Sequence, residues 1–255
     1  MNLITLDFET FYSQEFGFSK LTTEEYVRGD QFEVIGVAVK VNDGPIEWFS
    51  GDKKATAEWL SQFDWGNSFA LAHNTLFDGA ILSWHFGIRP KVLLDTLSML
   101  RATDGTEVGN SLAKLADRYG IGKKGTEVVD AKGLHRIDFP TAQLKQYGEY
   151  CKNDVALTYT LFNILVERFS LPELKLIDLT LSMFYNPVLQ LDTLLLEQHL
   201  MQVKDRKDKL LTACISDKDT LMSNPKLAEL LISLGVEPPK KISLTTGKET
   251  YAFAK

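Results

Sequence analysis

The sequence predicts an α/β fold, with a mixed five-stranded sheet flanked by helices and a mainly helical extension behind it. The first observation behind this prediction is the early position of the strand-like runs. They lie around Asp7, at 32–41, 46–50 and 68–74, and just after Pro90. The second observation is that apolar residues at helical spacing separate the later runs and then dominate the chain.

The runs FEVIGVAVKV (32–41) and IEWFS (46–50) flank a Gly44-Pro45 turn, which is typical of a β-hairpin. Helical spacing then recurs, and Gly120 follows one helix at the position where a left-handed residue commonly ends it. The helical segments are 55–63, 76–86, a stretch from about Asp95, 111–120 and 141–169.

A change of pattern at Leu171-Pro172 predicts a boundary between a first domain, 1–172, and a second, 173–255. The second domain contains one long helical pattern at 188–215 and ends in a polar, turn-rich tail. No apolar run approaches the roughly 20 residues that a membrane helix needs. The chain has only two cysteines, which suits a reducing compartment, and we expect a cytoplasmic protein with no membrane partner.

The net charge of −6 comes from the first part of the chain, where residues 1–170 hold 23 acidic against 17 basic side chains. Such a surface repels polyanions unless a divalent cation reverses the local charge. Tight, non-specific binding to duplex nucleic acid is therefore not expected.

Four acids form a pattern that carries chemistry. Asp7 and Glu9 share one face of an apolar strand, because residues i and i+2 point the same way. Asp78 lies near the start of a helix, and Asp154 interrupts an apolar helix face that also presents Tyr150 one turn earlier. Each acid alone has an ordinary structural explanation, such as a solvated strand face or a helix cap.

Taken together, the four carboxylates predict a site for a hard cation such as Mg²⁺ or Mn²⁺, and they do not favour zinc. Two such ions can activate a water and stabilise a leaving oxygen. The reaction class indicated is metal-assisted hydrolysis of a phosphodiester.

Three motifs in order carry a family resemblance: DFET (7–10), HNTLFD (73–78) and YCKND (150–154). They resemble the exonuclease motifs of the DnaQ-like 3′→5′ exonucleases, whose sheet is ribonuclease H-like. Because position 149 is Glu and position 150 is Tyr, the third motif resembles the tyrosine class, which includes the proofreading domains of DNA polymerases. The resemblance implies an exonuclease that removes nucleoside monophosphates from single-stranded or mispaired DNA 3′ ends.

The resemblance also implies roles for individual residues. Tyr150 would orient or help deprotonate the attacking water, and Asp7 would bridge two Mg²⁺ or Mn²⁺ ions. The implied metal ligands are Asp7, Glu9, Asp78 and Asp154, and the implied substrate contacts are Phe8, Thr10 and Asn74.

Residues 173–255 resemble the stretch that begins the thumb of phage and bacterial family A DNA polymerases. The chain has no room for a palm and fingers, so we expect no polymerase activity from it alone. The expected partners are single-stranded DNA 3′ ends and the remainder of a polymerase, in the same gene product or a second polypeptide, in a bacterial or phage-infected cell. Two alternatives stay open: an exoribonuclease of the same fold, and a non-catalytic module that binds DNA or a polymerase half.

Other features are expected to be structural. The run GIGKKG (120–125) predicts a mobile loop whose lysines steer a strand towards the acids. We expect His73 to make a structural hydrogen bond, Asp95 to cap a helix and Cys151 to lie in the core.

Overall fold

The computed structural model describes residues 1–125, 131–214, 216–243 and 245–253. It forms two compact units, Met1–Val188 and Leu189–Lys255, and each is described by itself.

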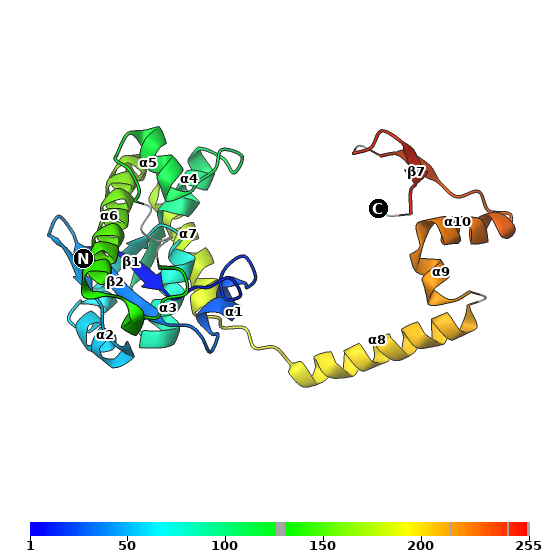
Figure 1. The fold of residues 1–255 in the computed structure, drawn as a ribbon, viewed down its shortest axis with the longest axis horizontal. Helices are drawn as coiled ribbons and strands as arrows, with labels where there is room; N and C mark the ends of the chain where they lie inside the picture. Colours follow the sequence, from blue (N-terminus) through cyan, green and yellow to red (C-terminus); the bar gives the residue numbers. More distant parts are fainter. Residues whose placement is uncertain (126–130, 215, 244, 254–255) are drawn as a thin grey trace. The chain divides into compact units, whose positions relative to one another are not determined.

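The first unit is built on one five-stranded sheet with the strand order β3-β2-β1-β4-β5 (Figure 1). Its strands are β1 (Asn2–Thr10), β2 (Val34–Val41), β3 (Ile46–Phe49), β4 (Ser68–Ala72) and β5 (Val92–Asp95). Strands β1, β4 and β5 are parallel, whereas β2 runs antiparallel to both β1 and β3. The predicted mixed sheet and its hairpin are therefore confirmed, with β1 at the centre.

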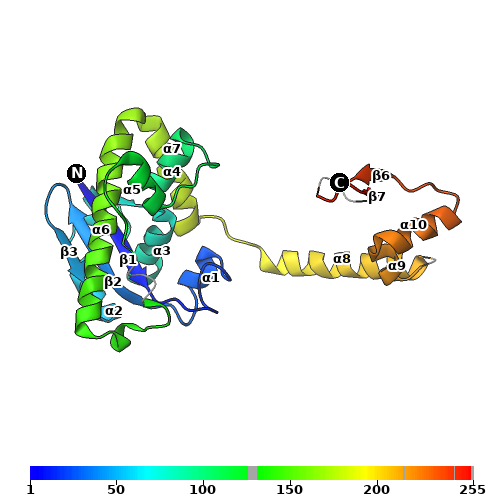
Figure 2. The same cartoon turned by 45° about the horizontal axis from the view of Figure 1, so that its top comes forward.

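Helices cover both faces of this sheet. They are α1 (Thr23–Val27), α2 (Lys53–Leu60), α3 (Thr75–Phe86), α4 (Thr96–Thr103), α5 (Leu112–Tyr119), α6 (Thr141–Leu165) and α7 (Leu171–Tyr185). Short 3₁₀ turns lie at Trp65–Asn67, Arg136–Asp138 and Val166–Arg168. The long helix α6 packs against β1, β2 and β3, while α3 and α7 pack on β5 and on each other (Figure 2).

Strand β1 is buried because apolar side chains cover it from both directions. Ile4, Leu6 and Phe8 join the main hydrophobic core with Ile81 and Leu82 of α3. The alternation of a strand sends the next set of side chains towards α6. Asp7 and Glu9 belong to this second set, as the sequence predicts.

The first unit extends beyond the predicted boundary at residue 172, because α7 is part of its fold. Asp178 accepts a hydrogen bond from the Leu93 amide of β5 at 2.7 Å, and the indole of Trp84 donates to the Tyr185 carbonyl at 3.0 Å. Leu181 and Tyr185 are buried. The Leu171-Pro172 pair, which suggested a linker, is the first turn of α7, where proline is well tolerated.

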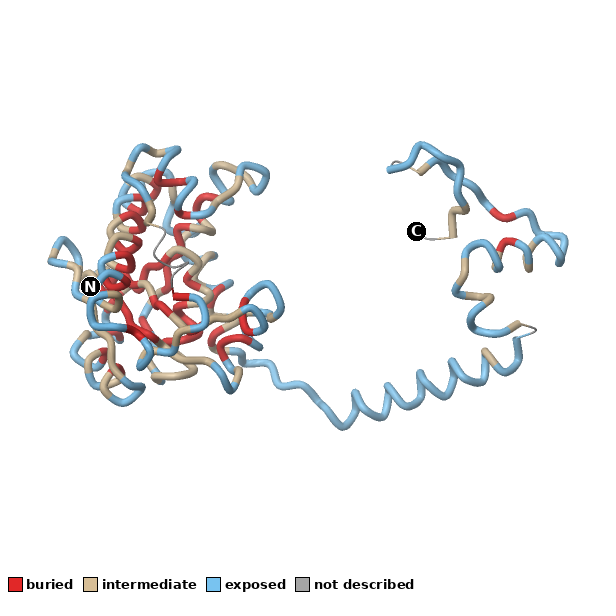
Figure 3. Tube along the Cα trace, viewed as in Figure 1, coloured by how far each residue is buried: buried red, intermediate tan, exposed pale blue. Residues whose placement is uncertain are grey.

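The second unit contains α8 (Thr193–Ala213), α9 (Lys218–Met222), α10 (Asn224–Ser233) and an antiparallel hairpin of β6 (Lys240–Ile242) and β7 (Glu249–Tyr251). The residues of α8 are exposed along nearly its whole length, and Leu211 is half-buried (Figure 3). The sequence predicts this helix but not the hairpin. No helix in the described part of the chain is both long and apolar enough to cross a membrane.

Candidate active site

The four predicted acids come from three elements that meet beside β1. Asp7 and Glu9 lie on β1, Asp78 in the first turn of α3, and Asp154 in the middle of α6. The Phe8 amide, between the two acids of β1, donates to Asp78 Oδ1 at 3.1 Å, which ties α3 to the strand. Glu9, Asp78 and Asp154 are buried, and Asp7 is half-buried. Residues far apart in the sequence thus form one acidic cluster.

Asp95 holds the turn between β4 and α3, the helix that carries Asp78. The backbone of Asn74 is left-handed, with φ of 79°, and its amide donates to Asp95 Oδ1 at 2.8 Å. The same carboxylate accepts from the amides of Leu97 and Ser98 at the start of α4, at 3.2 and 3.0 Å. Asp95 therefore stabilises the starts of two helices, and its prediction as a cap is confirmed.

Burial and mutual repulsion raise the free energy of the ionised forms of these acids, and therefore raise their pKa values. Burial first, and then the Asp154 charge, raise the pKa of Asp7 to about 7. Burial and the Asp7 charge raise the pKa values of Glu9 and Asp78 well above their ordinary range. A buried cluster of this kind gains free energy from a bound cation.

We expect the metal-free protein to lose stability as pH rises from about 4 to about 7, because the folded state holds a proton on Asp7 that the unfolded state has already released. At pH 8 in EDTA, replacing Asp7 by Asn should therefore raise the free energy of unfolding by about 1–3 kcal/mol. At pH 4 the gain should vanish. Urea unfolding at both pH values checks this, and an equal effect at pH 4 and pH 8 would contradict it.

Tyr150 lies in this cluster as the sequence predicts. It is buried on α6, and burial together with the Asp154 charge raises the pKa of its phenol. The phenol therefore stays protonated at neutral pH and can donate a hydrogen bond.

Sequence reasoning missed a second tyrosine. The Tyr147 hydroxyl donates to Glu9 Oε2 at 2.5 Å, and its ring stacks on Tyr150 with centroids 6.0 Å apart. Tyr147 precedes Asp154 by seven residues, or two helical turns, so the spacing alone placed it on the same face of α6. This hydrogen bond restrains the orientation of the Glu9 carboxylate.

Replacing Tyr147 by Phe should lower activity about tenfold and raise the Mg²⁺ concentration needed for half-maximal rate, because Glu9 loses its donor. Rates measured across a Mg²⁺ titration test this. The matched control is Tyr159→Phe on the same helix, whose hydroxyl bonds to Asp43 at 2.7 Å on the surface. Equal Mg²⁺ dependence in the two variants would refute the role of Tyr147.

Two further side chains join the acids. Cys151 is buried, as expected of a core residue, but its thiol also lies 3.3 Å from the Asp7 carbonyl and 3.5 Å from Asp7 Oδ2. One ligand atom each of Asp7, Glu9 and Cys151 lies within 4.8 Å of the others. Burial raises the pKa of the thiol well above its ordinary value, so the oxygen atoms are the better ligands. Lys124, from the run GIGKKG, forms an ion pair with Asp154.

His73 has a structural position, as predicted. Its ring nitrogens lie 2.9 Å from Thr96 Oγ1 and 3.0 Å from the Asn110 carbonyl oxygen. These contacts join the end of β4 to α4 and to the segment before α5.

An aromatic cavity of about 230 Å³ opens beside Glu9. It is lined by Phe8, Glu9, Thr10, Tyr12, Gly17, Phe18, Tyr26, Phe77 and Tyr147. Phe8 and Thr10 are predicted substrate contacts, although the Phe8 ring is buried against Phe86 with centroids 6.0 Å apart, and the Thr10 hydroxyl lies 2.8 Å from the Tyr26 hydroxyl. Asn74, the third, is not among the described lining residues.

Phe18 and Phe77 offer the more accessible rings of this cavity. They pack edge to face with centroids 5.4 Å apart, and Phe18 is 55% exposed. Neither residue stood out in the sequence, because each belongs to an unremarkable apolar pattern.

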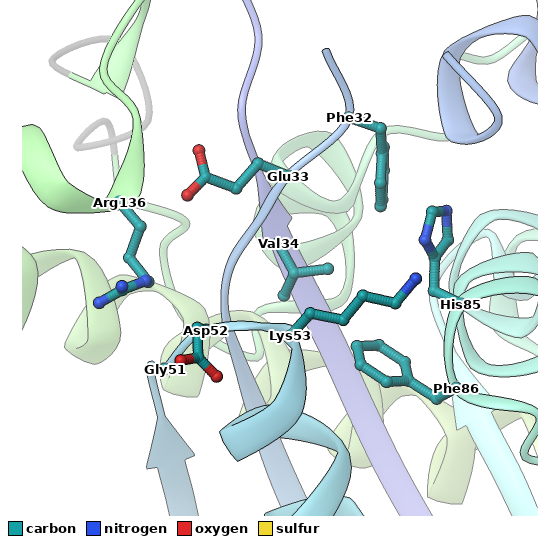
Figure 4. A pocket seen from close by; sticks show the side chains of 9 residues that line it. All are labelled: Phe32, Glu33, Val34, Gly51, Asp52, Lys53, His85, Phe86 and Arg136. Carbon is teal, nitrogen blue, oxygen red and sulfur yellow. The ribbon is translucent and has the colours of Figure 1, made fainter. Parts of the chain in front are cut away.

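A second cavity, of about 170 Å³, lies between the start of β2, the start of α2 and the end of α3 (Figure 4). Lys53 extends across it towards His85 and Phe86, and Glu33 and Arg136 lie at its other side (Figure 4). None of the predicted site residues lines it, so the acidic cluster with its aromatic cavity is the candidate active site.

No protein-family model matches the sequence, and no curated protein matches it either. Solved structures do share its architecture. NrnC of Brucella melitensis superposes with a TM-score of 0.50 and 17% identity, over 72% of this chain and 81% of that chain. RNase D of Trypanosoma brucei, solved in complex with RNA U12, superposes with a TM-score of 0.53 and 18% identity. The match covers 74% of this chain and 66% of that chain. The fold is ribonuclease H-like. At these identities the likeness shows the fold alone.

Proposed function

We propose that this protein is a metal-dependent 3′→5′ exonuclease that acts on single-stranded nucleic-acid ends. The observation that carries the proposal is the meeting of Asp7, Glu9, Asp78 and Asp154 at one buried place on a ribonuclease H-like sheet. Burying four carboxylates close together costs free energy, and bound cations offset this cost, so such a cluster is typical of a metal site.

The donor set fits hard divalent cations. Asp7, Glu9 and Asp78 have raised pKa values because they are buried and repel one another, and carboxylate oxygens are the ligands that Mg²⁺ and Mn²⁺ prefer. We propose two such ions, held by these three residues and Asp154. When bound, they would supply an activated water and stabilise the charge on the leaving oxygen.

The chain's own residues complete the site. Tyr150, kept as a neutral phenol, orients the attacking water by a hydrogen bond, while Tyr147 fixes the Glu9 carboxylate. The aromatic cavity beside Glu9 accepts the terminal base, because exposed rings such as Phe18 stack on any nucleobase. This arrangement favours unpaired ends over duplex ends, whose terminal base is already stacked.

We propose DNA as the substrate, with proofreading for a DNA polymerase as the role. The support is the motif YCKND with Tyr150, together with the family A likeness of residues 173–255. The second candidate is RNA, favoured by the fold shared with an RNase D solved in complex with RNA.

A direct comparison decides between the two substrates. Matched DNA and RNA strands of one sequence, labelled at the 5′ end, are incubated with the protein in Mg²⁺ and in EDTA. We expect stepwise shortening that needs Mg²⁺ and is faster on DNA. Faster shortening of RNA would reassign the substrate, while Mg²⁺-independent shortening would reject the metal site.

We further propose that residues 189–255 join this nuclease to the remainder of a family A polymerase in a bacterial or phage-infected cell. The support is the apolar surface of α8, where Leu194 and Leu195 are 66% and 62% exposed. In this role the chain alone would extend no primer.

A further inference from the structure

The segment 120–124, here called the lysine loop, is anchored in the first unit at its start. Gly120 ends α5 in a left-handed conformation with φ of 63°, and the Ile121 amide donates to the Ala116 carbonyl at 3.0 Å. The Ile121 side chain packs against the hydrophobic cluster between α5 and α6. The loop therefore leaves α5 in a fixed direction.

The backbone of the lysine loop lies directly on α6. The side-chain amide of Asn153 donates through Nδ2 to the Lys123 carbonyl at 2.9 Å. Gly122 has a φ of 141°, which residues other than glycine rarely adopt, and an added Cβ would also stand 3.0 Å from Leu157 Cδ2, so glycine suits this close approach to α6. Both contacts flank Asp154 on the same helix.

These anchors place the next side chain in the acidic cluster. The Lys124 ammonium forms an ion pair with Asp154 Oδ2 and lies 5.1 Å from the centre of the Tyr150 ring. The Lys124 side chain is 26% exposed and that of Asp154 is 4% exposed. The positive charge of Lys124 also acts on Asp7 and Glu9, whose pKa values it lowers against the larger effect of burial.

This ion pair brings a positive charge into direct contact with one of the four acids. The ammonium therefore neutralises part of the charge that a divalent cation would otherwise meet. An ammonium and a metal ion cannot both hold the same carboxylate oxygen at contact distance without strong repulsion. Because Lys124 also lies close enough to interact with Asp7 and Glu9, a lysine displaced from Asp154 stays at the site, where the phosphodiester of a bound strand would offer it a new anion.

We propose that Lys124 is a positioning residue of the nuclease site: it holds Asp154 in the metal-free protein, competes with a divalent cation for that carboxylate, and pairs with the substrate phosphate once displaced. This inference rests on the proposed function and deepens it. In this way Lys124 couples the binding of a divalent cation to the binding of a nucleic-acid strand.

The test compares Lys124→Met, Lys124→Arg and Lys123→Met. Lys123→Met is the matched control, because it removes the same charge from an exposed neighbouring side chain. Mn²⁺ affinity is measured from the free-ion resonance signal, with no nucleic acid present. We expect Lys124→Met to bind Mn²⁺ about tenfold more tightly than the wild-type protein, and the other two variants to bind as the wild type does.

The second readout is the affinity for a single DNA strand in Ca²⁺, which supports binding without rapid cleavage. We expect Lys124→Met to weaken it and Lys124→Arg to restore it. Circular dichroism confirms that each variant is folded. Unchanged Mn²⁺ affinity or unchanged strand affinity in a folded Lys124→Met protein would overturn the inference while leaving the nuclease proposal standing. A wild-type protein that binds no Mn²⁺ and cleaves nothing would overturn both.

Discussion

Replacing Asp7 by Asn is expected to lower the rate of 3′ shortening by about a thousandfold or more. Asp7 lies at the centre of the cluster, because Glu9, Asp78 and Asp154 all interact with its charge. The amide keeps the size of the side chain but removes the charge that a shared metal ligand needs. Single-turnover rates at saturating Mg²⁺ measure the effect.

The matched control is Asp117→Asn on α5. This carboxylate is exposed and is not one of the four acids of the cluster. It should retain the wild-type rate. An Asp7→Asn protein that is folded, stable and as active as this control would show that the acids do not carry the chemistry.

Replacing Tyr150 by Phe is expected to lower kcat about a hundredfold and to leave KM nearly unchanged, because the hydroxyl acts on the water rather than on strand binding. The ring packing against Tyr147 and the position beneath Lys124 should survive the change. Initial rates over a range of strand concentrations separate the two constants.

Tyr159→Phe removes a hydroxyl from the exposed side of the same helix and serves again as the control. A rise in KM with constant kcat in Tyr150→Phe would assign Tyr150 to substrate binding. No change in either constant would remove it from the site altogether.

The sequence predicted the acids well because local rules determine their directions. Strand alternation placed Asp7 and Glu9 on one face, and helical spacing placed Tyr150 and Asp154 together. Their assembly into one site depends on the strand order β3-β2-β1-β4-β5, which only the structure shows. The family resemblance implied a ribonuclease H-like sheet without its strand order. The metal and substrate roles of these residues stay predictions.

Contacts between distant segments escaped prediction. Lys124 reaches Asp154 only because Gly122 and Asn153 bring the lysine loop against α6, 30 residues further along the chain. The aromatic cavity likewise joins Phe18, in the turn between β1 and α1, to Phe77 of α3. The periodicity of one helix or strand does not predict contacts between residues of different segments.

The predicted boundary at residue 172 differs from the end of the first compact unit at Val188 for a related reason. A Leu-Pro pair is compatible both with a linker and with the first turn of a helix, and only the packing of α7 on α3 and β5 decides between them. The β6–β7 hairpin was missed because its strands are three residues long and almost fully exposed, so they show no alternation.

The most direct test of the central claim uses a 5′-labelled single strand of DNA and its blunt duplex, incubated with the protein in Mg²⁺, in EDTA, and as the Asp7→Asn variant. We expect stepwise loss of nucleotides from the 3′ end, faster on the single strand, and no loss in EDTA or in the variant. Tight binding of the strand in Mg²⁺ without any shortening would contradict it, and would show that the chain is a binding module instead.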